Sequence, residues 1–317
     1  MKRFLFLLAI LLVAGAAGGW VWAQRTWVAP GPLAAPAQLV IPRGANGPAI
    51  GALLAEAGVI ADARLFTAAA WITRGQGPLR AAEFAFPPTA SLEQVLEILR
   101  RARPVQRRVT IPEGLTIRQI QPLLERAEGL TGDTPPFAEA ALLPETYTYQ
   151  WGDTRAALVA RADAAMDTAL AEAWAARAQN LPLASAREAL VLASIVERET
   201  ARPEERARVA GVFINRLRRG MPLQSDPTVA YAAAAGPLDR PISRADLDRD
   251  HPFNTYRIRG LPPGPIAAPG VASLRAVTRP EVHEFLYFVA DGTGGHAFAR
   301  TLEEHNQNVA RWRALTR

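Results

Sequence analysis

The spacing of hydrophobic and polar positions changes along this chain, and each pattern predicts a different element. The first pattern is an uncharged run from Phe4 to Ala23, directly after Lys2 and Arg3. A run of this length can cross a bilayer as a helix. Because cations flanking a span stay in the cytoplasm, the rest of the chain is expected on the other side. We therefore expect residues 1–25 to be a short tail and a single-pass anchor in the inner membrane, with the remainder in the periplasm.

A cleaved signal peptide is the alternative interpretation of this N-terminus. The small residues Ala14–Gly19 could precede a cleavage site. Two features favour the anchor: the apolar run is longer than an ordinary signal core, and Trp20 and Trp22 continue it past the small residues. Both interpretations export the chain.

After a Pro/Ala-rich stretch over residues 26–36, which predicts a semi-rigid linker, a short motif occurs twice. Ile41-Pro42-Arg43-Gly44 is matched by Ile111-Pro112-Glu113-Gly114. Apolar positions follow at the same offset in both copies, namely Ile50, Leu53, Leu54 and Ala57 in the first and Ile120, Leu123, Leu124 and Ala127 in the second. Each copy predicts a strand, a turn and an amphipathic helix. We expect a small α/β module over residues 37–104 and a second domain over 105–317.

Several further elements complete an α+β fold class, with a mixed α/β second domain. Between the copies, the alternating stretch Glu83–Phe86 predicts a strand, and Ser91 with Gln94 predicts a capped helix start. Thr116 with Gln119 forms the same capping pattern in the second copy. Pro122 is expected to kink that helix or to begin a new one.

Composition narrows the chemistry. The chain has no cysteine, and its four histidines are scattered, so neither a thiol nucleophile nor a metal site nor any other cofactor is expected. The formal net charge is +6, but Lys2, Arg3 and Arg25 lie in the first 25 residues, so the rest is only mildly basic. Most cations are arginines beside glutamates on predicted helices, which argues against a nucleic-acid partner. A mildly basic surface would still suit an acidic wall polymer.

The most informative segment is a predicted helix over 186–200. Its apolar positions Leu192, Ile195 and Val196 lead directly into two carboxylates, Glu197 and Glu199. A carboxyl at the end of an apolar stripe suits general acid catalysis, because desolvation raises its pKa toward neutrality. Downstream, a loop rich in small polar groups could grip a substrate; its candidate residues are Gln224, Ser225, Asp226 and Thr228.

Helical geometry distinguishes the two glutamates. Residues two apart point about 200° apart around a helix. Glu199 continues the stripe of Leu192 and Ile195, whereas Glu197 falls on the side of Ser194. Glu199 is therefore the better placed acid. The alternative is that both carboxylates pair with arginines near the helix end, Arg198, Arg202 or Arg206.

Six motifs then occur in one order: ASIVERET, VFINRLRRGMPLQSDPTVAY, ISRADL, NTYRIRGLPPGPIAAPG, LYFVADGTGGHAFA and EHNQNV. Together they resemble the YceG-like family of membrane-anchored endolytic murein transglycosylases. The resemblance implies a LysM-like first module and Glu199 as the catalytic residue. It also implies substrate contacts in a groove, for which the matching residues are Gln224, Asp226, Thr228, Asn254 and Tyr256. Glu197, and His296 beside the Gly294-Gly295 turn, are two further candidates for substrate contact.

The reaction implied by this resemblance cleaves the bond between N-acetylmuramic acid and N-acetylglucosamine within glycan strands. It leaves an anhydro-muramoyl end and needs one acid, whereas hydrolysing glycosidases generally use two carboxylates. The expected partners are peptidoglycan strands and the membrane, with penicillin-binding protein synthases as candidates. Two alternatives stay open: a glycan hydrolase in which Asp226 is the second carboxylate, and a non-catalytic wall-binding scaffold.

Overall fold

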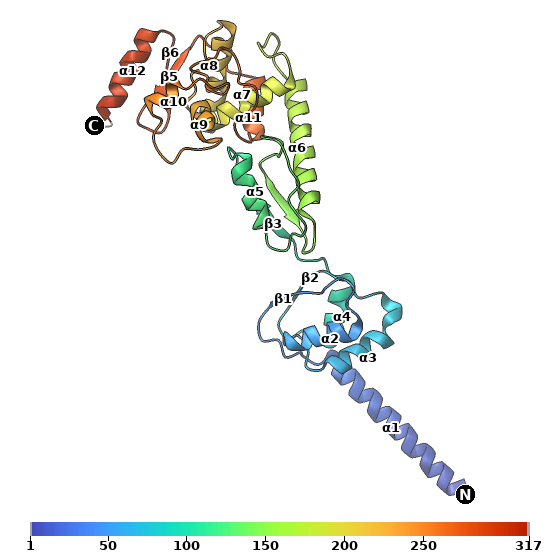
Figure 1. Cartoon of the computed structure of the whole chain (residues 1–317). Coiled ribbons are helices and arrows are strands. Elements are labelled where there is room, and N and C mark those ends of the chain that lie inside the picture. The colour runs from blue at the N-terminus through green and yellow to red at the C-terminus, as the bar shows by residue number, and fades with distance from the viewer. Residues whose placement is uncertain (1, 316–317) are drawn as a thin grey trace. The chain divides into compact units, whose positions relative to one another are not determined.

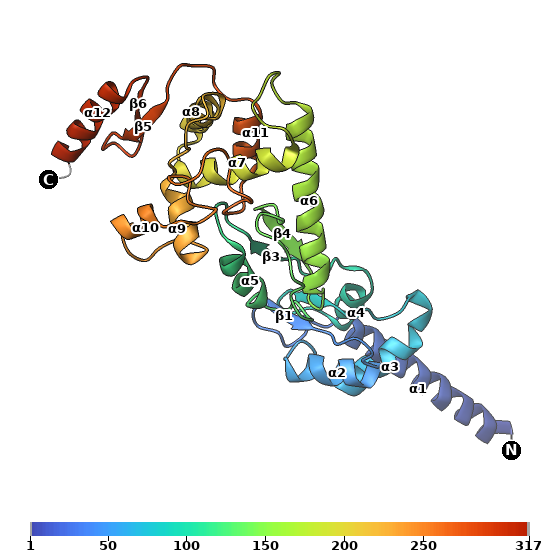
Figure 2. The ribbon, with the colours of Figure 1, turned by 45° about the horizontal axis from the view of Figure 1, so that its top comes forward.

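The protein divides into two compact units, drawn in Figures 1 and 2. The computed structural model describes residues 2–315. Unit 1 comprises the chain up to Arg107 together with Tyr149–Gly152, and unit 2 comprises Arg108–Thr148 and everything from Asp153 onward. Helices and three two-stranded sheets make up both units, which confirms a mixed α+β fold.

Unit 1 is a two-stranded sheet packed with helices. Its elements are α1 (Lys2–Val28), β1 (Ala37–Val40), α2 (Gly47–Glu56), α3 (Ala63–Ile72), η1 (Arg74–Gln76), β2 (Glu83–Phe86) and α4 (Leu92–Arg101). Strands β1 and β2 are antiparallel, with Ala37 opposite Phe86 and Val40 opposite Glu83. The predicted strand Glu83–Phe86 is confirmed. Ser91 and Gln94 form the predicted capping box, which satisfies backbone donors at the start of α4.

The core of unit 1 is a cluster of fully buried aliphatic and aromatic side chains that includes Leu54, Phe66, Phe84 and Leu99. They come from α2, α3, β2 and α4, so each helix contributes its apolar face to the same interior. This is why a unit with so small a sheet has a core of its own.

The N-terminal helix α1 covers the uncharged run of the sequence. Among the residues whose side chains the structure describes, no helix combines the length and apolar character that a membrane crossing requires. The expected membrane anchor is therefore not confirmed.

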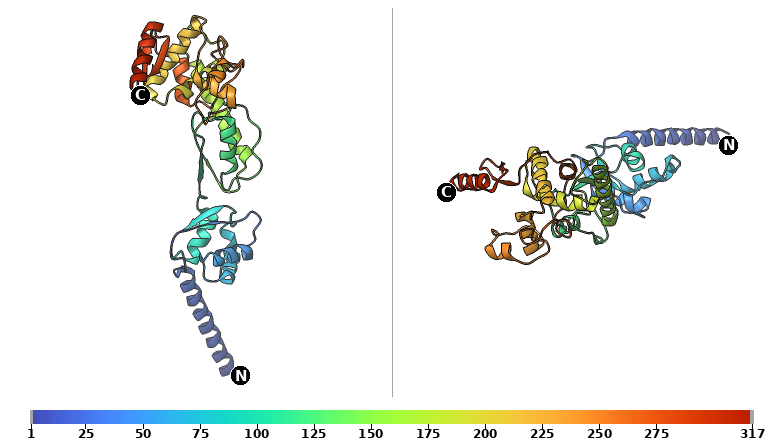
Figure 3. Two further views of the ribbon diagram at one scale, coloured as in Figure 1. Left: turned by 60° about the vertical axis from the view of Figure 1, so that its left-hand side comes forward. Right: turned by 90° about the horizontal axis from the view of Figure 1, so that it is seen from above.

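Unit 2 contains the remaining elements, shown from two further sides in Figure 3. They are β3 (Arg107–Thr110), α5 (Ile117–Glu125), β4 (Thr146–Tyr149), α6 (Arg155–Ala175), α7 (Ala186–Glu199), η2 (Pro203–Glu205), α8 (Arg206–Arg218), α9 (Asp226–Ala234), α10 (Arg244–Asp248), α11 (Val271–Thr278), β5 (Tyr287–Ala290), β6 (His296–Ala299) and α12 (Leu302–Leu315). Two residues of the strand pair β3–β4, Arg107 and Tyr149, count with unit 1. The repeat is confirmed as β1–turn–α2 and β3–turn–α5, and α5 continues through Pro122 rather than ending there.

Helix α7 is the centre of unit 2. Every residue from Ala189 to Val196 is buried, so the helix is enclosed on all sides rather than on one face. It packs against α6, α8, α9 and α11. Its two ends reach a more open environment, and the C-terminal turn carries Glu197 and Glu199.

Helix α8 holds the segment that leads to the last strands. The backbone of Glu281 donates to the carbonyl of Ala207 at 2.9 Å, and Asn215 donates to the carbonyls of His283 and Phe285 at 2.7 and 3.1 Å. Gly211 lies between these contacts along α8. A Cβ atom added there would lie 2.5 Å from the Glu281 carbonyl oxygen. The absence of a side chain at this position permits the close approach.

Candidate active site

The C-terminal turn of α7 places Glu199 beside the polar loop that follows α8. Glu199 is half-buried, and the helix ends immediately after it at Thr200. The hydroxyl of Ser225 donates a hydrogen bond to Glu199 Oε1. The predicted helix is thus confirmed, and the acid and the polar loop meet as the sequence indicated.

Burial raises the pKa of the Glu199 carboxyl to about 7, and the negative charge of Asp226 acts in the same direction. The Ser225 hydrogen bond and the charges of Arg216 and Arg198 oppose this rise by stabilising the ionised form. A carboxyl with this pKa is populated in both protonation states near neutral pH. Glu199 can therefore give up a proton and take one back, as an acid–base group must.

A pocket of about 490 Å³ opens at Glu199. On one side it is lined by Arg216 of α8 and by Gln224, Asp226 and Tyr256. The other wall comes from the C-terminal elements, with Tyr287, Phe288, Val289 and Ala290 from β5, His296 from β6, and Leu302, His305, Val309 and Trp312 from α12. The hollow thus combines an acid, hydrogen-bonding groups and aromatic rings, as small-molecule sites commonly do.

Two predicted contact residues face each other in this pocket. The hydroxyl of Tyr256 donates to Asp226 Oδ1 at 2.7 Å, and both residues line the hollow. Burial raises the pKa of the Tyr256 hydroxyl, and the neighbouring Asp226 raises it further, so the phenol keeps its proton. Gln224 is exposed in the pocket and adopts a left-handed backbone with φ 51°. All three residues line the pocket, and their contact with a substrate stays a prediction.

Thr228 lies elsewhere than expected, since it is fully buried and does not line the pocket. Its hydroxyl donates to the carbonyl of Ser225 at 2.6 Å and lies 2.8 Å from the hydroxyl of Thr255. Thr255 Oγ1 in turn accepts from the backbone of Ser225 at 2.9 Å. Thr228 therefore holds the polar loop in place instead of touching a ligand, which corrects the prediction.

Asn254 is a second correction. It is also fully buried, and its Nδ2 donates to the carbonyls of Asp246, Leu247 and Arg249 at 3.2, 3.0 and 2.8 Å. Its Oδ1 accepts from the backbone of Tyr256 at 3.0 Å. Because all of these groups are protein atoms, Asn254 shapes the loop that carries Tyr256 and does not reach the pocket.

Glu197 belongs to a different network, on the opposite side of α7. Its side chain is only 4% exposed; one oxygen accepts from the backbone of Gly270 at 2.9 Å and the other lies 3.2 Å from the guanidinium of Arg206. Glu113 shares the same arginine, and burial followed by the negative charge of Glu197 raises the pKa of Glu113. The expected substrate contact of Glu197 is wrong. The alternative of pairing with an arginine holds for this glutamate, whereas Glu199 bonds to a hydroxyl.

His296 reaches the pocket as predicted, and Glu205 fixes its orientation. The backbone amide of His296 donates to Glu205 Oε1 at 3.1 Å, and His296 Nδ1 lies 2.7 Å from Oε2 of the same carboxylate. The ring also meets Phe288 edge-on at 5.2 Å. Two contacts to one carboxylate hold the imidazole in a single orientation.

Sequence reasoning missed Arg216. Buried in α8, it donates to the carbonyls of Leu286, Pro222 and Leu223, and to the side chain of Gln224 at 3.0 Å. Its guanidinium lies over the Tyr287 ring, 5.1 Å from the centroid. Arg216 thereby joins the polar loop to the C-terminal wall. In the sequence, Arg216 resembles a solvent-exposed helix cation. Only its contacts with residues distant along the chain reveal this role.

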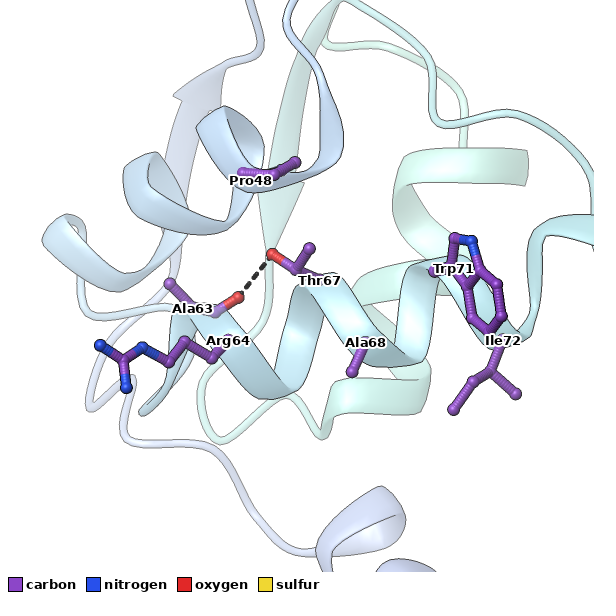
Figure 4. Close-up of a pocket in the computed structure, with 7 residues that line it drawn as sticks. All are labelled: Pro48, Ala63, Arg64, Thr67, Ala68, Trp71 and Ile72. Atoms are coloured by element: carbon purple, nitrogen blue, oxygen red, sulfur yellow. Dashed lines mark hydrogen bonds between the residues drawn. The ribbon is translucent and has the colours of Figure 1, made fainter.

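A larger hollow of about 770 Å³ lies in unit 1 along α3 and is shown in Figure 4. Its lining is mostly apolar and includes Pro48, Ala68, Trp71 and Ile72, with Arg64 as the charged member. Acid–base chemistry needs groups that titrate near neutral pH, and Glu199 is the group that supplies one. The larger volume of the unit 1 hollow therefore does not make it the better candidate for the active site. Within residues 2–315, no group of three or more His, Cys, Asp and Glu side chains could hold a metal ion.

Comparison with known proteins gives concordant matches. A model of the YceG-like family matches residues 39–311. The endolytic murein transglycosylase of Streptococcus pneumoniae (serotype 2, strain D39) is 31% identical over 320 residues, which covers 85% of this chain and 57% of that protein. The one from Bacillus subtilis (strain 168) is 38% identical over 169 residues, covering 53% and 46%. This chain thus spans about half the length of these curated relatives. A crystal structure of a YceG-like protein from Listeria monocytogenes superposes with a TM-score of 0.55 at 28% identity, covering 86% of this chain and 98% of that one.

Proposed function

Because the chain belongs to the YceG-like family, we propose that it is an endolytic murein transglycosylase. It would cleave the bond between N-acetylmuramic acid and N-acetylglucosamine inside peptidoglycan strands and leave an anhydro-muramoyl end. The names of the two relatives support the reaction. The observation that carries it is the half-buried Glu199, whose pKa of about 7 allows one residue to act as both acid and base.

The chemistry uses a single proton-transfer group. Glu199 gives its proton to the glycosidic oxygen as the bond from that oxygen to the muramoyl C1 breaks. The C6 hydroxyl of the same sugar then forms a bond to C1, and its proton returns to Glu199. Atoms and protons balance without water. Much of the rate comes from positioning, since the attacking hydroxyl is already part of the substrate.

The hydrogen bond from Ser225 supports the second half of this cycle. A hydroxyl donor stabilises the carboxylate that remains after protonation of the leaving group. Burial does the opposite and keeps the acid form accessible. The balance of the two effects puts the pKa near the pH at which both forms are needed.

The pocket walls suit a polysaccharide. Gln224, Asp226 and Tyr256 offer hydrogen-bonding groups to hydroxyl and acetamido substituents, while Phe288 of β5 and Trp312 of α12 offer apolar surface for sugar rings. The unit 1 module, LysM-like by resemblance, and penicillin-binding protein synthases as partners stay predictions.

A hydrolase is the second candidate, because Asp226 lines the same pocket as Glu199. A hydrolase would use this second carboxylate to activate water or to attack the sugar. The experiment that decides is mass spectrometry of products from purified glycan strands. A transglycosylase product lacks one water at its new muramoyl end, relative to a hydrolase product. An inert chain would support the wall-binding scaffold instead.

We also propose a single-pass anchor in the inner membrane, with the active site on the periplasmic side. The support is sequence alone: the uncharged run Phe4–Ala23 and the preceding Lys2 and Arg3. Protease added to spheroplasts should digest both units and leave a short membrane fragment. A full-length, protected chain would overturn the proposal, and a mature N-terminus near Gln24 would favour a cleaved signal peptide.

A further inference from the structure

Helix α3 of unit 1 presents an apolar surface to solvent. Trp71 and Ile72, at the C-terminal end of this helix, are 66% and 70% exposed. Outside α1, they are the exposed large hydrophobic side chains among the described residues of unit 1. Figure 4 shows both side chains extending away from the ribbon. Trp71 also lines two hollows of about 770 and 550 Å³, together with Pro48 and Thr67, so the apolar surface continues on both sides of its ring.

The charged groups of this surface are cationic. Residues 63–80 contain three arginines and no carboxylate, and Asp62 just before them caps the start of α3. Arg64 lines the larger hollow and Arg74 the smaller one, and both are exposed. The Arg74 guanidinium lies over the Trp71 ring, 4.3 Å from its centroid. Exposed apolar side chains beside arginines suit the boundary between anionic lipid headgroups and acyl chains, because each part of the surface meets its complement there.

The C-terminal end of α1 is docked on unit 1, close to the uncharged run. Trp27 packs against the core cluster of unit 1, and α1 contacts α4. Trp27 lies only four residues after Ala23, which is about 6 Å along a helix. The headgroup layer of a bilayer is about 5–8 Å thick on each side. If the run spans the membrane, unit 1 therefore lies against the headgroups, and Figures 1 and 2 show α3 on the side of unit 1 from which α1 extends.

We propose that this surface of α3 rests on an anionic bilayer. Trp71 and Ile72 enter the headgroup region, while the guanidiniums of Arg64 and Arg74 pair with lipid phosphates. The inference rests on the proposed anchor, which brings unit 1 to the bilayer, and it gives unit 1 a partner that the proposed reaction does not involve. Stacking on a glycan strand is the competing use of an exposed tryptophan. The two arginines and the short distance to the proposed span favour the lipid.

Single cysteines can report the position of this surface, because the chain has none of its own. Ile72→Cys places a fluorophore on the surface, and the matched control Gln38→Cys places the same fluorophore at an exposed position of β1. The full chain is reconstituted in vesicles of phosphatidylethanolamine and phosphatidylglycerol. A quencher near the headgroup end of an acyl chain should quench the label of Ile72→Cys at least about threefold more than that of Gln38→Cys.

The arginines are tested in the background of Ile72→Cys. Arg64→Gln and Arg74→Gln should each weaken docking on these vesicles roughly fivefold, because each removes one attraction to the anionic surface. The excess quenching should likewise shrink in vesicles of phosphatidylcholine alone. Quenching that is indifferent to both changes would overturn the pairing with lipid phosphates.

Insertion of the chain is measured separately, by resistance to carbonate extraction, so that the anchor and the surface are judged apart. Equal quenching at the two positions of an inserted chain would overturn the α3 surface and leave the anchor standing. Preferential quenching of the Ile72→Cys label in a chain that carbonate extracts would overturn the anchor and keep the surface. A label that responds to purified glycan strands instead of vesicles would show a sugar site and refute the proposal. None of these outcomes depends on the release of anhydro ends.

Discussion

The hydroxyl of Ser225 donates its hydrogen bond to Glu199, and so links the residue before α9 to the last residue of α7. This contact opposes the effect of burial on the pKa of the carboxyl. Ser225 is itself held by the hydroxyl of Thr255, which accepts from its backbone amide at 2.9 Å. The protonation of Glu199 is therefore under the control of a loop far away in sequence.

Ser225→Ala should move the pH dependence of the reaction. The glycosidic oxygen needs the protonated form of Glu199, so kcat/KM should fall as pH rises through the pKa of about 7. Loss of the Ser225 donor removes a contact that stabilises the ionised form, so the falling limb should shift to higher pH. The check is the pH profile of anhydro-end release by both proteins. An unmoved limb would mean that the hydroxyl does not tune the acid.

Glu199→Gln should abolish most of the reaction. The change keeps the size of the side chain but removes the transferable proton, so we expect at least the ~10²–10⁴-fold loss typical of one proton-transfer group. The matched control is Glu197→Gln, on the other side of the same helix. Any loss of activity in Glu197→Gln should result from lowered stability, because Glu197 forms hydrogen bonds with Gly270 and Arg206. Near-normal turnover of a well-folded Glu199→Gln protein would contradict the mechanism.

Glu199→Gln should also reveal how much the buried Glu199 carboxyl lowers the stability of the folded protein. The folded pKa of Glu199, about 7, exceeds its ordinary value of 4.5. The folded state therefore holds the proton more tightly, and the contribution of this group to stability falls as pH rises from 4.5 to 7. The full difference corresponds to roughly 3 kcal/mol, an upper limit for a half-buried group. Glu199→Gln should thus match its parent in melting temperature near pH 4 and exceed it at pH 8. Parallel melting curves across this range would show that burial does not raise the pKa.

Asp226→Asn distinguishes the two glycan-cleaving reactions. A hydrolase that uses Asp226 as its second carboxylate should lose about 10²–10⁴-fold in kcat. The proposed transglycosylase should lose mainly affinity, with kcat within about tenfold, because Asp226 then serves to hold Tyr256 and the substrate. Tyr256→Phe is the control, since it removes the same hydrogen bond and keeps the carboxylate. The measurement is kcat and KM on purified strands, with product masses.

Much of the local structure could be predicted from the sequence, while Glu199 as the acid stays a prediction. The capping patterns at Ser91 and Thr116 involve neighbours three residues away, so they can be read from the chain directly. The direction of Glu199 follows from helical periodicity. What the sequence could not supply were partners distant along the chain. Asn254 and Thr228 lie in motifs of the resemblance, and a motif does not show whether a residue contacts the substrate or holds the loop. In the structure, both form hydrogen bonds with protein groups.

Apart from His296, the residues of the far wall of the pocket were missed for the same reason. Tyr287 and Trp312 lie in separate elements, and they meet Glu199 only through the packing of β5 and α12. Arg216 is another example, since its acceptors include Leu286, seventy residues later. No spacing rule within one helix or strand predicts such neighbours.

The close approach at Gly211 lets α8 set the spacing between the two walls of the active-site pocket. One end of this helix carries Arg216 into the pocket, while its flank fixes the segment 281–283 that leads into β5. A methyl group in Gly211→Ala would collide with backbone and must displace that segment. We expect a raised KM together with a lowered melting temperature, and unchanged kinetics would refute the coupling. The distance between the two walls of the pocket thus depends on a residue that does not line it.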